Sequence, residues 1–421
     1  MIDKFGAYID NLASSNPEKA RKRLILGFKA LKSSFKYLSQ RQLSPARKHL
    51  SVSLMDTIIS PYVNPESSAL VSFFTPCEML HTMGIYPQAA EAISGGINAA
   101  AAEKYFVEHA EKTGIAETYC SYHKIMIGSV LSGVVPKPAL TACTSLACDA
   151  NNLSFPLIAQ HWNIPYFYID VPVDRSPDSI AYVADQLKDY GSFLEDVTGK
   201  RLDEERLKKT LASTERTLKN LTRAQQLKKD RYLNNSLRGE LFEIFGSHIM
   251  LGTPDMETYS NLLCRDLERA DRTKGVRILW MHVVPYYIEP LVKLMSFNPR
   301  CEIITCEMNY DVCTDIDPEK PYESMAKRLV YHPFNGSYTY RAESSIKMCK
   351  ELDIDGVIYF CQWGCKHTAG IAACMKESFE AAGYPMLILG GDACDRNNGG
   401  EGQLMTRIEA FVEMLEDSKL T

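Results

Sequence analysis

A short apolar run that ends at a cysteine and is followed by a helical pattern recurs along this chain, and this feature constrains the fold most. The clearest case is residues 357–360, which have the β-branched and aromatic content of a buried strand and are followed by Cys361 and Cys365. A helix is predicted over residues 371–382 and a further strand over residues 386–389. Strands that alternate with helices predict a parallel sheet, so the expected fold class is α/β.

The first half of the chain repeats this pattern. Residues 69–74 are predicted to form a strand, and a helix is expected to open at Cys77. Residues 138–142 form a second strand candidate that ends at Cys143, and residues 164–172 form a third. Cysteines that follow parallel strands are expected at one edge of the sheet, which is where ligands bind in open α/β sheets.

A chain of 421 residues is too long for a single core, so several domains are expected. Residues from about 179 to 245 have the leucine spacing and the many charges of long amphipathic helices. The pair Gly95-Gly96 is expected to interrupt the helical pattern of the first lobe. The predicted organisation is an N-terminal helical arm at 1–65, a first α/β lobe at 66–178, a helical segment at 179–274 and a second α/β lobe at 275–421.

Composition excludes several function classes. The net charge of -5 gives no electrostatic reason to expect binding of nucleic acid or of an anionic membrane. No apolar run approaches 18 residues, and the N-terminal residues lack the apolar core of a signal peptide. We therefore expect a cytoplasmic protein without membrane contact.

Thirteen cysteines need an explanation. The number is odd and no secretion signal is visible, so a disulfide framework is not expected. Five of the cysteines lie in helix-like or unplaced stretches and are interpreted as packing residues: Cys264, Cys301, Cys313, Cys349 and Cys374. Most of the other eight lie after a strand-like run or before a helix: Cys77, Cys120, Cys143, Cys148, Cys306, Cys361, Cys365 and Cys394.

The motifs that are absent narrow the enzyme classes. The sequence contains no Gly-x-x-x-x-Gly-Lys-Ser/Thr, no Gly-x-Gly-x-x-Gly after a strand and no His-Glu-x-x-His, so ATP or dinucleotide binding by those devices is not expected. Zinc stays an alternative, but the cysteines are too dispersed for a zinc ribbon or finger. Thiolates gathered from several strand ends favour an iron-sulfur cluster, because soft ligands select such units.

Several stretches resemble motifs of the 2-hydroxyacyl-CoA dehydratase and benzoyl-CoA reductase family, in the family's order. Residues 72–87 resemble its Pro-x-Glu-Leu-x-x-Ala-x-Gly-x-x-Pro opening, and Cys120-Ser121 is similar to its Cys-Ser motif. Cys148-Asp149 and the Asn-Ile-Pro strand at 163–172 resemble its cysteine loop and the strand after it. The strand at 357–361, together with Gly391-Asp392 and Gln403-x-x-Thr-Arg-x-x-Ala-Phe, resembles its C-terminal signature.

The resemblance implies two flavodoxin-like parallel-sheet lobes with an N-terminal helical arm and an intervening helical segment. It also implies a 4Fe-4S cluster held by three cysteines, which correspond to Cys120, Cys148 and Cys361, with Cys143 competing for the middle place. A separate ATP-hydrolysing iron-sulfur activator and a homodimer are further implied. The absence of a nucleotide motif in this chain agrees with such an activator.

This sequence departs from the family pattern by its additional cysteines. Six thiols are candidate ligands, namely Cys77, Cys120, Cys143, Cys148, Cys361 and Cys365, and Cys306 or Cys394 are open as replacements. Six exceed the need of one cubane, so the chain resembles the double-cubane branch of the family, with an 8Fe-9S cluster that reduces a small molecule.

Two alternatives to the double-cubane reductase stay open. One is a single-cluster dehydratase or reductase subunit that acts on an acyl-CoA, and the other is a non-catalytic electron carrier or scaffold. The sequence does not identify the natural substrate. The candidate groups for proton transfer are Glu78, His123, Lys124 and His367.

Overall fold

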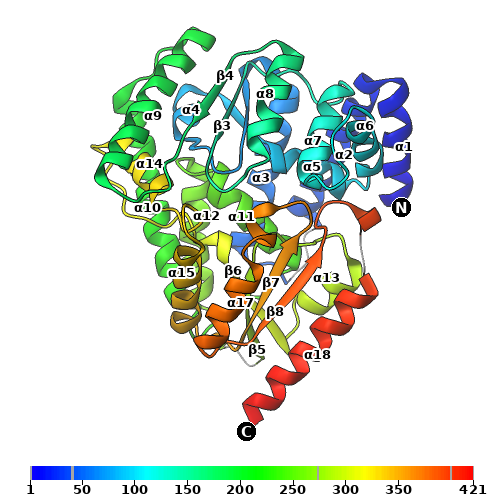
Figure 1. Cartoon of the computed structure of the whole chain (residues 1–421), viewed down its shortest axis with the longest axis vertical. Coiled ribbons are helices and arrows are strands. Elements are labelled where there is room, and N and C mark those ends of the chain that lie inside the picture. Colours follow the sequence, from blue (N-terminus) through cyan, green and yellow to red (C-terminus); the bar gives the residue numbers. More distant parts are fainter. Residues whose placement is uncertain (1, 39–41, 273–274, 399–400, 421) are drawn as a thin grey trace.

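The computed structural model describes residues 2–38, 42–272, 275–398 and 401–420. Two four-stranded sheets form the centres of two lobes, one above the other in Figure 1. The strand order is β2-β1-β3-β4 in the first sheet and β6-β5-β7-β8 in the second. All strand pairs within the two sheets are parallel, which confirms the predicted α/β class with two flavodoxin-like lobes.

The strands are short, and most are almost entirely buried, as expected for parallel sheets covered by helices, whereas the edge strands β4 and β8 are partly exposed. Those of the first sheet are β1 Ser68–Val71, β2 Tyr86–Ala89, β3 Leu140–Thr144 and β4 Tyr166–Ile169. Those of the second are β5 Val276–Met281, β6 Cys301–Cys306, β7 Gly356–Gln362 and β8 Met386–Gly391.

The helices fall into four groups along the chain. The arm consists of α1 Ile2–Ser15, α2 Pro17–Tyr37 and α3 Pro45–Val63. The first lobe has α4 Glu78–Met83, α5 Ala90–Ala99, α6 Glu103–Lys112, α7 Ser121–Leu131 and α8 Asn151–Trp162. The helical segment has α9 Pro177–Thr198, α10 Glu204–Leu227, α11 Leu237–Ile249 and α12 Pro254–Glu268. The second lobe has α13 Glu289–Met295, α14 Pro321–Val330, α15 Tyr338–Glu351, α16 Lys366–Ala369, α17 Ala372–Ala381 and α18 Glu401–Leu420.

The strand order creates a switch point in each sheet. In the first sheet, the chain passes from β1 to β2 toward one edge and from β3 to β4 toward the other edge. In the second sheet, it passes from β5 to β6 toward one edge and from β7 to β8 toward the other. Ligands in open α/β folds bind outside the carboxyl ends of strands at such points. The loop after β3 contains Cys148 and the loop after β7 contains Cys365, so both lobes place a thiol at a switch point.

Three local predictions differ from the structure. Strand β2 was not predicted, because its sequence Tyr-Pro-Gln-Ala lacks a β-branched run. Helix α5 continues through Gly95 and Gly96, where a break was expected, and a Cβ on Gly96 would lie only 3.1 Å from the Phe28 ring, so this glycine serves close packing. Strand β7 extends to Gln362, which places Cys361 inside the strand rather than after it.

The N-terminal arm is joined to the rest of the chain through α3, which packs against α11 and α12. Arg47 of α3 is buried and forms ion pairs with Glu240, at 3.5 Å, and with Glu243. Since β1 begins at Ser68 and β5 at Val276, we propose for the structure the same four segments that the sequence predicts.

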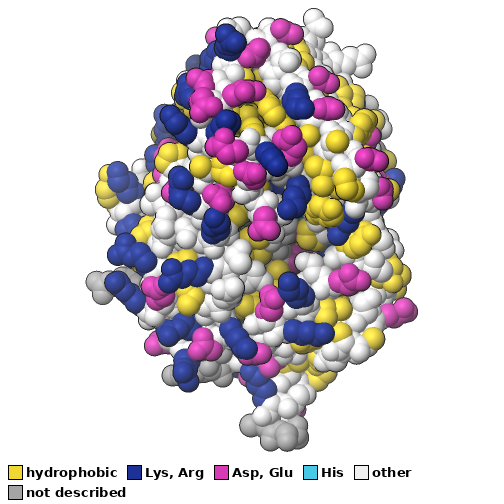
Figure 2. Space-filling view, turned by 90° about the vertical axis from the view of Figure 1, so that its left-hand side faces the viewer, with side chains coloured by type: hydrophobic (Ala, Val, Ile, Leu, Met, Phe, Trp, Pro, Cys, Tyr) yellow, Lys and Arg dark blue, Asp and Glu magenta, His cyan; other side chains and the backbone are white. Residues whose placement is uncertain are grey.

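The surface has no single dominant charge on the face shown in Figure 2, where basic and acidic side chains are interspersed around a hollow near the middle. Among the described residues, no helix combines the length and the apolar character needed to cross a membrane.

Candidate functional site

Thiols from both lobes meet between the sheets. Cys120 lies at the N-terminal end of α7, Cys148 in the loop after β3, and Cys365 at the N-terminal end of α16. The charges of these three thiols interact with one another, and that of Cys361 interacts with Cys365. All four side chains are partly exposed. The fold therefore brings together four of the six predicted ligands, and we call them the cysteine cluster.

Gly364 allows the two lobes to approach at the cysteine cluster. Its φ is +76°, in the left-handed region, and a Cβ there would lie 2.7 Å from the backbone nitrogen of Cys120 and 2.8 Å from the carbonyl oxygen of Thr118. A side chain would collide with backbone, which cannot move away cheaply. A glycine is thus required for the Cys365 loop to lie directly on the Cys120 loop.

Asp392 holds the cluster segments together. Its carboxylate accepts a short hydrogen bond from the Ser121 hydroxyl and one of 3.0 Å from the Gln362 side-chain amide. The backbone N–H of Cys394 also donates to it, at 2.9 Å. Ser121 follows Cys120 and Gln362 follows Cys361, so a single buried carboxylate positions one cysteine segment from each lobe.

Cys394 is a fifth thiol beside the cluster. It is fully buried, its charge interacts with that of Cys120, and its carbonyl oxygen accepts a 2.8 Å hydrogen bond from Asn98 in the first lobe. Cys306, the other replacement that the sequence left open, has its main charge interactions with Glu240 and Glu243.

The two remaining predicted ligands have other neighbours. The Cys77 thiol donates to the Thr75 carbonyl at 3.3 Å, and its main charge interactions are with Glu78 and Arg328. The Cys143 thiol lies in β3, 3.4 Å from the Tyr166 hydroxyl. Both follow the strand pattern of the sequence, yet their described contacts lie outside the cysteine cluster.

The free thiols of the cluster are poor acids. Burial raises the pKa of Cys120, Cys148 and Cys361, and the neighbouring thiols raise it further. Protonated thiols packed together make weak nucleophiles. A bound metal centre reverses this preference because its positive charge ionises the thiols that coordinate it. Soft donors in this number and arrangement fit an iron-sulfur cluster.

His123 is the predicted proton-transfer residue whose contacts reach the cluster. Its Nε2 lies 3.4 Å from the Cys148 sulfur, and its Nδ1 lies 2.8 Å from the Ser154 hydroxyl. Burial lowers the pKa of His123 to about 4, so the ring is neutral at neutral pH. A neutral ring with Nδ1 bound to Ser154 can donate its Nε2 proton to a Cys148 thiolate.

The other three predicted proton-transfer residues have different surroundings. Lys124 is buried and donates to Glu111 at 2.7 Å and to the Glu117 carbonyl at 2.8 Å. His367 is partly exposed, its ring lies 5.3 Å from the Phe334 ring, and partial burial lowers its pKa to about 4.

Glu78 is held in a buried ion pair. It is fully buried, and Arg328 binds both of its carboxylate oxygens, at 2.6 and 2.9 Å. Burial opposes ionisation of Glu78, but the Arg328 charge and hydrogen bonds outweigh it and lower the pKa. The carboxylate therefore fastens α4 to α14 and is ionised at neutral pH.

Glu91 is a candidate that the sequence analysis missed. Its carboxylate lies in the first turn of α5, and its charge interacts with those of Cys143 and Cys148. Burial raises the pKa of Glu91 to about 7, so it holds or releases a proton near neutral pH. If β2 had been recognised in the sequence, Glu91 would have been placed just after a strand end, where ligand-binding side chains are expected.

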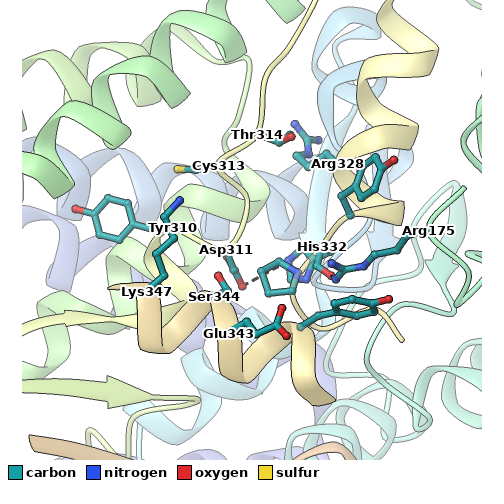
Figure 3. Close-up of a pocket in the computed structure, with 13 residues that line it drawn as sticks. Arg175, Tyr310, Asp311, Cys313, Thr314, Arg328, His332, Glu343, Ser344 and Lys347 are labelled. Atoms are coloured by element: carbon teal, nitrogen blue, oxygen red, sulfur yellow. Dashed lines mark hydrogen bonds and ion pairs between the residues drawn. The ribbon is translucent and has the colours of Figure 1, made fainter. Parts of the chain in front are cut away.

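A pocket of about 370 Å³, lined in part by Arg328, the partner of Glu78, is drawn in Figure 3. Its lining combines the basic side chains Arg175 and Lys347 with Asp311 and His332, which point toward each other. Arg175 also lies over the Tyr340 ring, 3.5 Å from its centroid. The pocket is thus lined by basic side chains, a histidine and two acids, Asp311 and Glu343.

Comparisons with known proteins agree with the family resemblance. The family model described as "2-hydroxyglutaryl-CoA dehydratase, D-component" matches residues 72–415, which include every strand except β1 and the whole cysteine cluster. The (R)-phenyllactyl-CoA dehydratase alpha subunit of Clostridium sporogenes is 24% identical over 374 residues, which cover 82% of this chain and 88% of that protein.

Two further relatives have similar names. The lactoyl-CoA dehydratase subunit alpha of Anaerotignum propionicum is 24% identical over 389 residues, 81% of this chain and 89% of that protein. The (R)-2-hydroxyglutaryl-CoA dehydratase subunit alpha of Acidaminococcus fermentans is 22% identical over 303 residues, 67% of this chain and 61% of that protein.

Proposed function

This chain belongs to the 2-hydroxyglutaryl-CoA dehydratase D-component family, and from that premise we propose that it is the iron-sulfur subunit of a dehydratase acting on a 2-hydroxyacyl thioester of coenzyme A. The observation that supports this most is the convergence of Cys120, Cys148, Cys361 and Cys365 between the lobes. The names of the three relatives, each a subunit of a 2-hydroxyacyl-CoA dehydratase, supply the substrate class.

We propose a 4Fe-4S cluster held by Cys120, Cys148 and either Cys361 or Cys365, with the fourth thiol close by. Cys77 and Cys143 are left out of this set because their contacts lie elsewhere. When bound, such a cluster supplies low-potential electrons and a Lewis-acidic iron. The hydrogen bond that His123 can donate to Cys148 stabilises the thiolate form of that ligand.

Side chains of this protein would carry out the proton transfers of a dehydration. Loss of water from a 2-hydroxyacyl thioester requires that a proton leave carbon and that hydroxide leave as water. Glu91 is suited to this work because its pKa of about 7 lets it accept and return a proton near neutral pH. Glu78 is a poorer candidate, because Arg328 keeps its carboxylate ionised and donates hydrogen bonds to both of its oxygens.

We further propose that electrons come from a separate ATP-hydrolysing activator, since the sequence has no nucleotide-binding motif of its own. The relatives are named as alpha subunits, so a second, related subunit is a candidate partner beside the homodimer that the sequence analysis predicts. Native mass spectrometry of the anaerobically purified protein distinguishes a homodimer from a complex with a second subunit.

We also propose that the protein is cytoplasmic.

A double-cubane reductase is the second candidate function. It is favoured by the fifth thiol, Cys394, beside Cys120 and by the pair Cys361 and Cys365, which together exceed the need of one cubane. In that case the substrate is a small unsaturated molecule rather than an acyl-CoA.

Iron and sulfide analysis after anaerobic purification tests both candidates. We expect about four irons per chain and ATP-dependent dehydration of a 2-hydroxyacyl-CoA when the activator is added. About eight irons per chain, with reductase but no dehydratase activity, would favour the double-cubane enzyme. A colourless, iron-free, fully folded protein after anaerobic purification would refute both.

The variant Cys365→Ser separates the candidates at a single residue. Serine is a poor substitute for thiolate on iron. In a double cubane Cys365→Ser should lose a substantial part of the iron, and Cys361→Ser at least as much. In a single cubane held by Cys361, Cys365→Ser should keep its iron. Cys374→Ser, on the partly exposed side of α17, is the matched control and should change neither iron nor activity.

A further inference from the structure

Three side chains from distant parts of the sequence meet beside the pocket in Figure 3, which shows two of them, Asp311 and His332. His248 comes from the end of α11, Asp311 from the loop after β6, and His332 from the end of α14. One ligand atom of each lies within 4.8 Å of the others. The His248 Nε2 is 3.3 Å from one Asp311 oxygen, and the His332 Nε2 is 3.5 Å from the other.

The facing atoms of these side chains have no hydrogen-bond partner among the described residues, although they are buried. This applies to Nε2 of both histidines and to both carboxylate oxygens of Asp311, whose described polar contacts are the two ion-pair contacts with one another. The three side chains are only 2 to 3% exposed. Buried polar atoms are rarely left unpaired in folded proteins, so such a group calls for a bound species.

The hydrogen bonds of His248 determine which of its nitrogens is free. Its Nδ1 lies 2.8 Å from the Ile244 carbonyl oxygen, which can only accept, so Nδ1 bears the proton. If Nε2 carries no second proton to share with Asp311, its lone pair faces an Asp311 oxygen, and two acceptors 3.3 Å apart repel each other unless a cation lies between them. Metal-binding histidines commonly donate their other N–H to a backbone carbonyl in this way.

The separations fit a tetrahedral metal site. Zinc binds histidine nitrogen and carboxylate oxygen at about 2.0–2.1 Å, which places neighbouring donors of a tetrahedron roughly 3.3–3.4 Å apart. The two histidine nitrogens lie 3.3 and 3.5 Å from different oxygens of Asp311, and one ligand atom of each residue lies within 4.8 Å of the others, so small side-chain rotations would bring the three donors onto one ion. Packing also fixes the ring of His248, which stacks on Phe73 with 4.1 Å between the centroids.

We propose that His248, Asp311 and His332 bind a zinc ion, separate from the cysteine cluster and independent of the proposed dehydratase function. Nitrogen and oxygen donors of this kind suit zinc, whereas magnesium and calcium prefer oxygen donors alone. None of the three residues is part of the family motifs in this sequence.

The site has an open side. Asp311 and His332 line the pocket together with Arg175 and Lys347, while His248 is not part of the lining. Three protein ligands leave a fourth position for water or for a ligand from the pocket. In the lining, Arg175 and Lys347 are balanced by Asp311 and Glu343, and Arg328 is neutralised by Glu78, so the charges of the pocket do not select an anion for that position.

One contact competes with the metal. The backbone N–H of Phe334 donates to Nδ1 of His332 at 3.1 Å. When Nε2 of a neutral His332 binds zinc, Nδ1 must bear the proton, so this hydrogen bond is given up. Zinc affinity is therefore lower than for a site whose three ligands are all preorganised, and a metal can be removed by a chelator.

Zinc binding and X-ray absorption test the proposal. The protein, purified anaerobically, is treated with a chelator and titrated with Zn²⁺. We expect one Zn²⁺ per chain, with nitrogen and oxygen but no sulfur in its first coordination shell, beside whatever iron the cluster retains. Sulfur in that shell would place the zinc at the cysteines and overturn the proposal, as would folded wild-type protein that binds no Zn²⁺.

Two variants and a control localise the metal. His248→Gln and Asp311→Asn should each weaken Zn²⁺ binding at least tenfold, because each removes one of three ligands. His161→Gln, which changes an exposed histidine on α8, should bind Zn²⁺ as the wild type does. If one variant does not fold, judged by circular dichroism, the other decides. Unchanged binding by a folded variant overturns the assignment, and a proton shared between Nε2 of His248 and Asp311 then accounts for their contact.

Discussion

Cysteines follow strands in two regions of the first lobe, but only one of the regions brings thiols together. Cys77 follows β1 and packs beside the buried ion pair of Glu78 and Arg328. Cys148 follows β3, next to the switch point of the sheet, and meets Cys120 and Cys365. Both strands flank the switch point, so a cysteine after such a strand is not enough to identify a ligand, and the packing of each loop decides which thiols face the other lobe.

The largest expected effect concerns the Cys77 region. Glu78→Gln removes the partner of a buried guanidinium and leaves Arg328 uncompensated, so we expect unfolding free energy to fall by about 3–5 kcal/mol. Glu18→Gln, which breaks an exposed ion pair on α2, is the control and should change stability little. Urea denaturation measures both, and a change in Glu78→Gln no larger than in the control would show that this region is not held by the ion pair.

The next effect concerns the contact between the lobes. Gly364→Ala places a Cβ 2.7 Å from the Cys120 backbone at a φ of +76°, so we expect a loss of about 2–3 kcal/mol and of most of the bound iron. Gly383→Ala also has a positive φ but meets nothing within 4 Å, so it should cost only about 1 kcal/mol and keep its iron. Equal iron loss in the two variants would contradict the close approach described for Gly364.

A smaller effect is expected at the carboxylate that joins the two cysteine segments. Asp392→Asn keeps the shape but weakens the charge-assisted hydrogen bonds from Ser121 and Gln362, so stability should fall by about 1–3 kcal/mol. The loss of a negative charge near Cys120 should also raise the midpoint potential of a bound cluster. A potentiometric titration measures this, and an unchanged potential would mean that Asp392 does not act on the cluster.

The smallest expected change is in the slope of stability against pH. The pKa of Glu91 is about 7 in the folded protein and near 4.5 for a free glutamate side chain, so the folded state holds a proton that the unfolded state releases. The contribution of this bound proton to the stability of the folded state is complete below pH 4.5 and is lost as pH rises through about 7. Glu91→Gln should remove up to about 1 kcal/mol of this dependence per pH unit. Identical stability curves for variant and wild type between these pH values would refute the pKa assignment.

The strands were predictable because their signals are local. Runs such as 357–360 are β-branched and aromatic, and they end at residues that favour loops. The set of residues that form the site was not predictable in the same way, because it depends on the order of the strands and on which loops of the two lobes face each other. Both depend on contacts between residues far apart in the sequence. Cys365 and Cys77 look alike in sequence but have different neighbours, and Glu91 follows a strand whose Pro87 and Gln88 concealed it.

His248, Asp311 and His332 also lacked a sequence signal. They come from three separate segments and share no short motif, so no spacing of metal ligands is visible. Only the packing of α11 against the end of β6 and the turn after α14 brings their atoms together. Metal sites built from such distant residues require the fold before they can be recognised.

The most direct test of the account is the iron content of two cysteine variants, Cys148→Ser and Cys77→Ser, purified anaerobically side by side. Both replace a buried or partly exposed thiol that follows a strand of the first sheet. If the cysteine cluster holds the iron, Cys148→Ser should lose most of its iron and its visible absorption, while Cys77→Ser should keep both. Full iron in Cys148→Ser, or an equal loss in Cys77→Ser, would contradict the assignment of the cluster to the thiols that meet between the lobes.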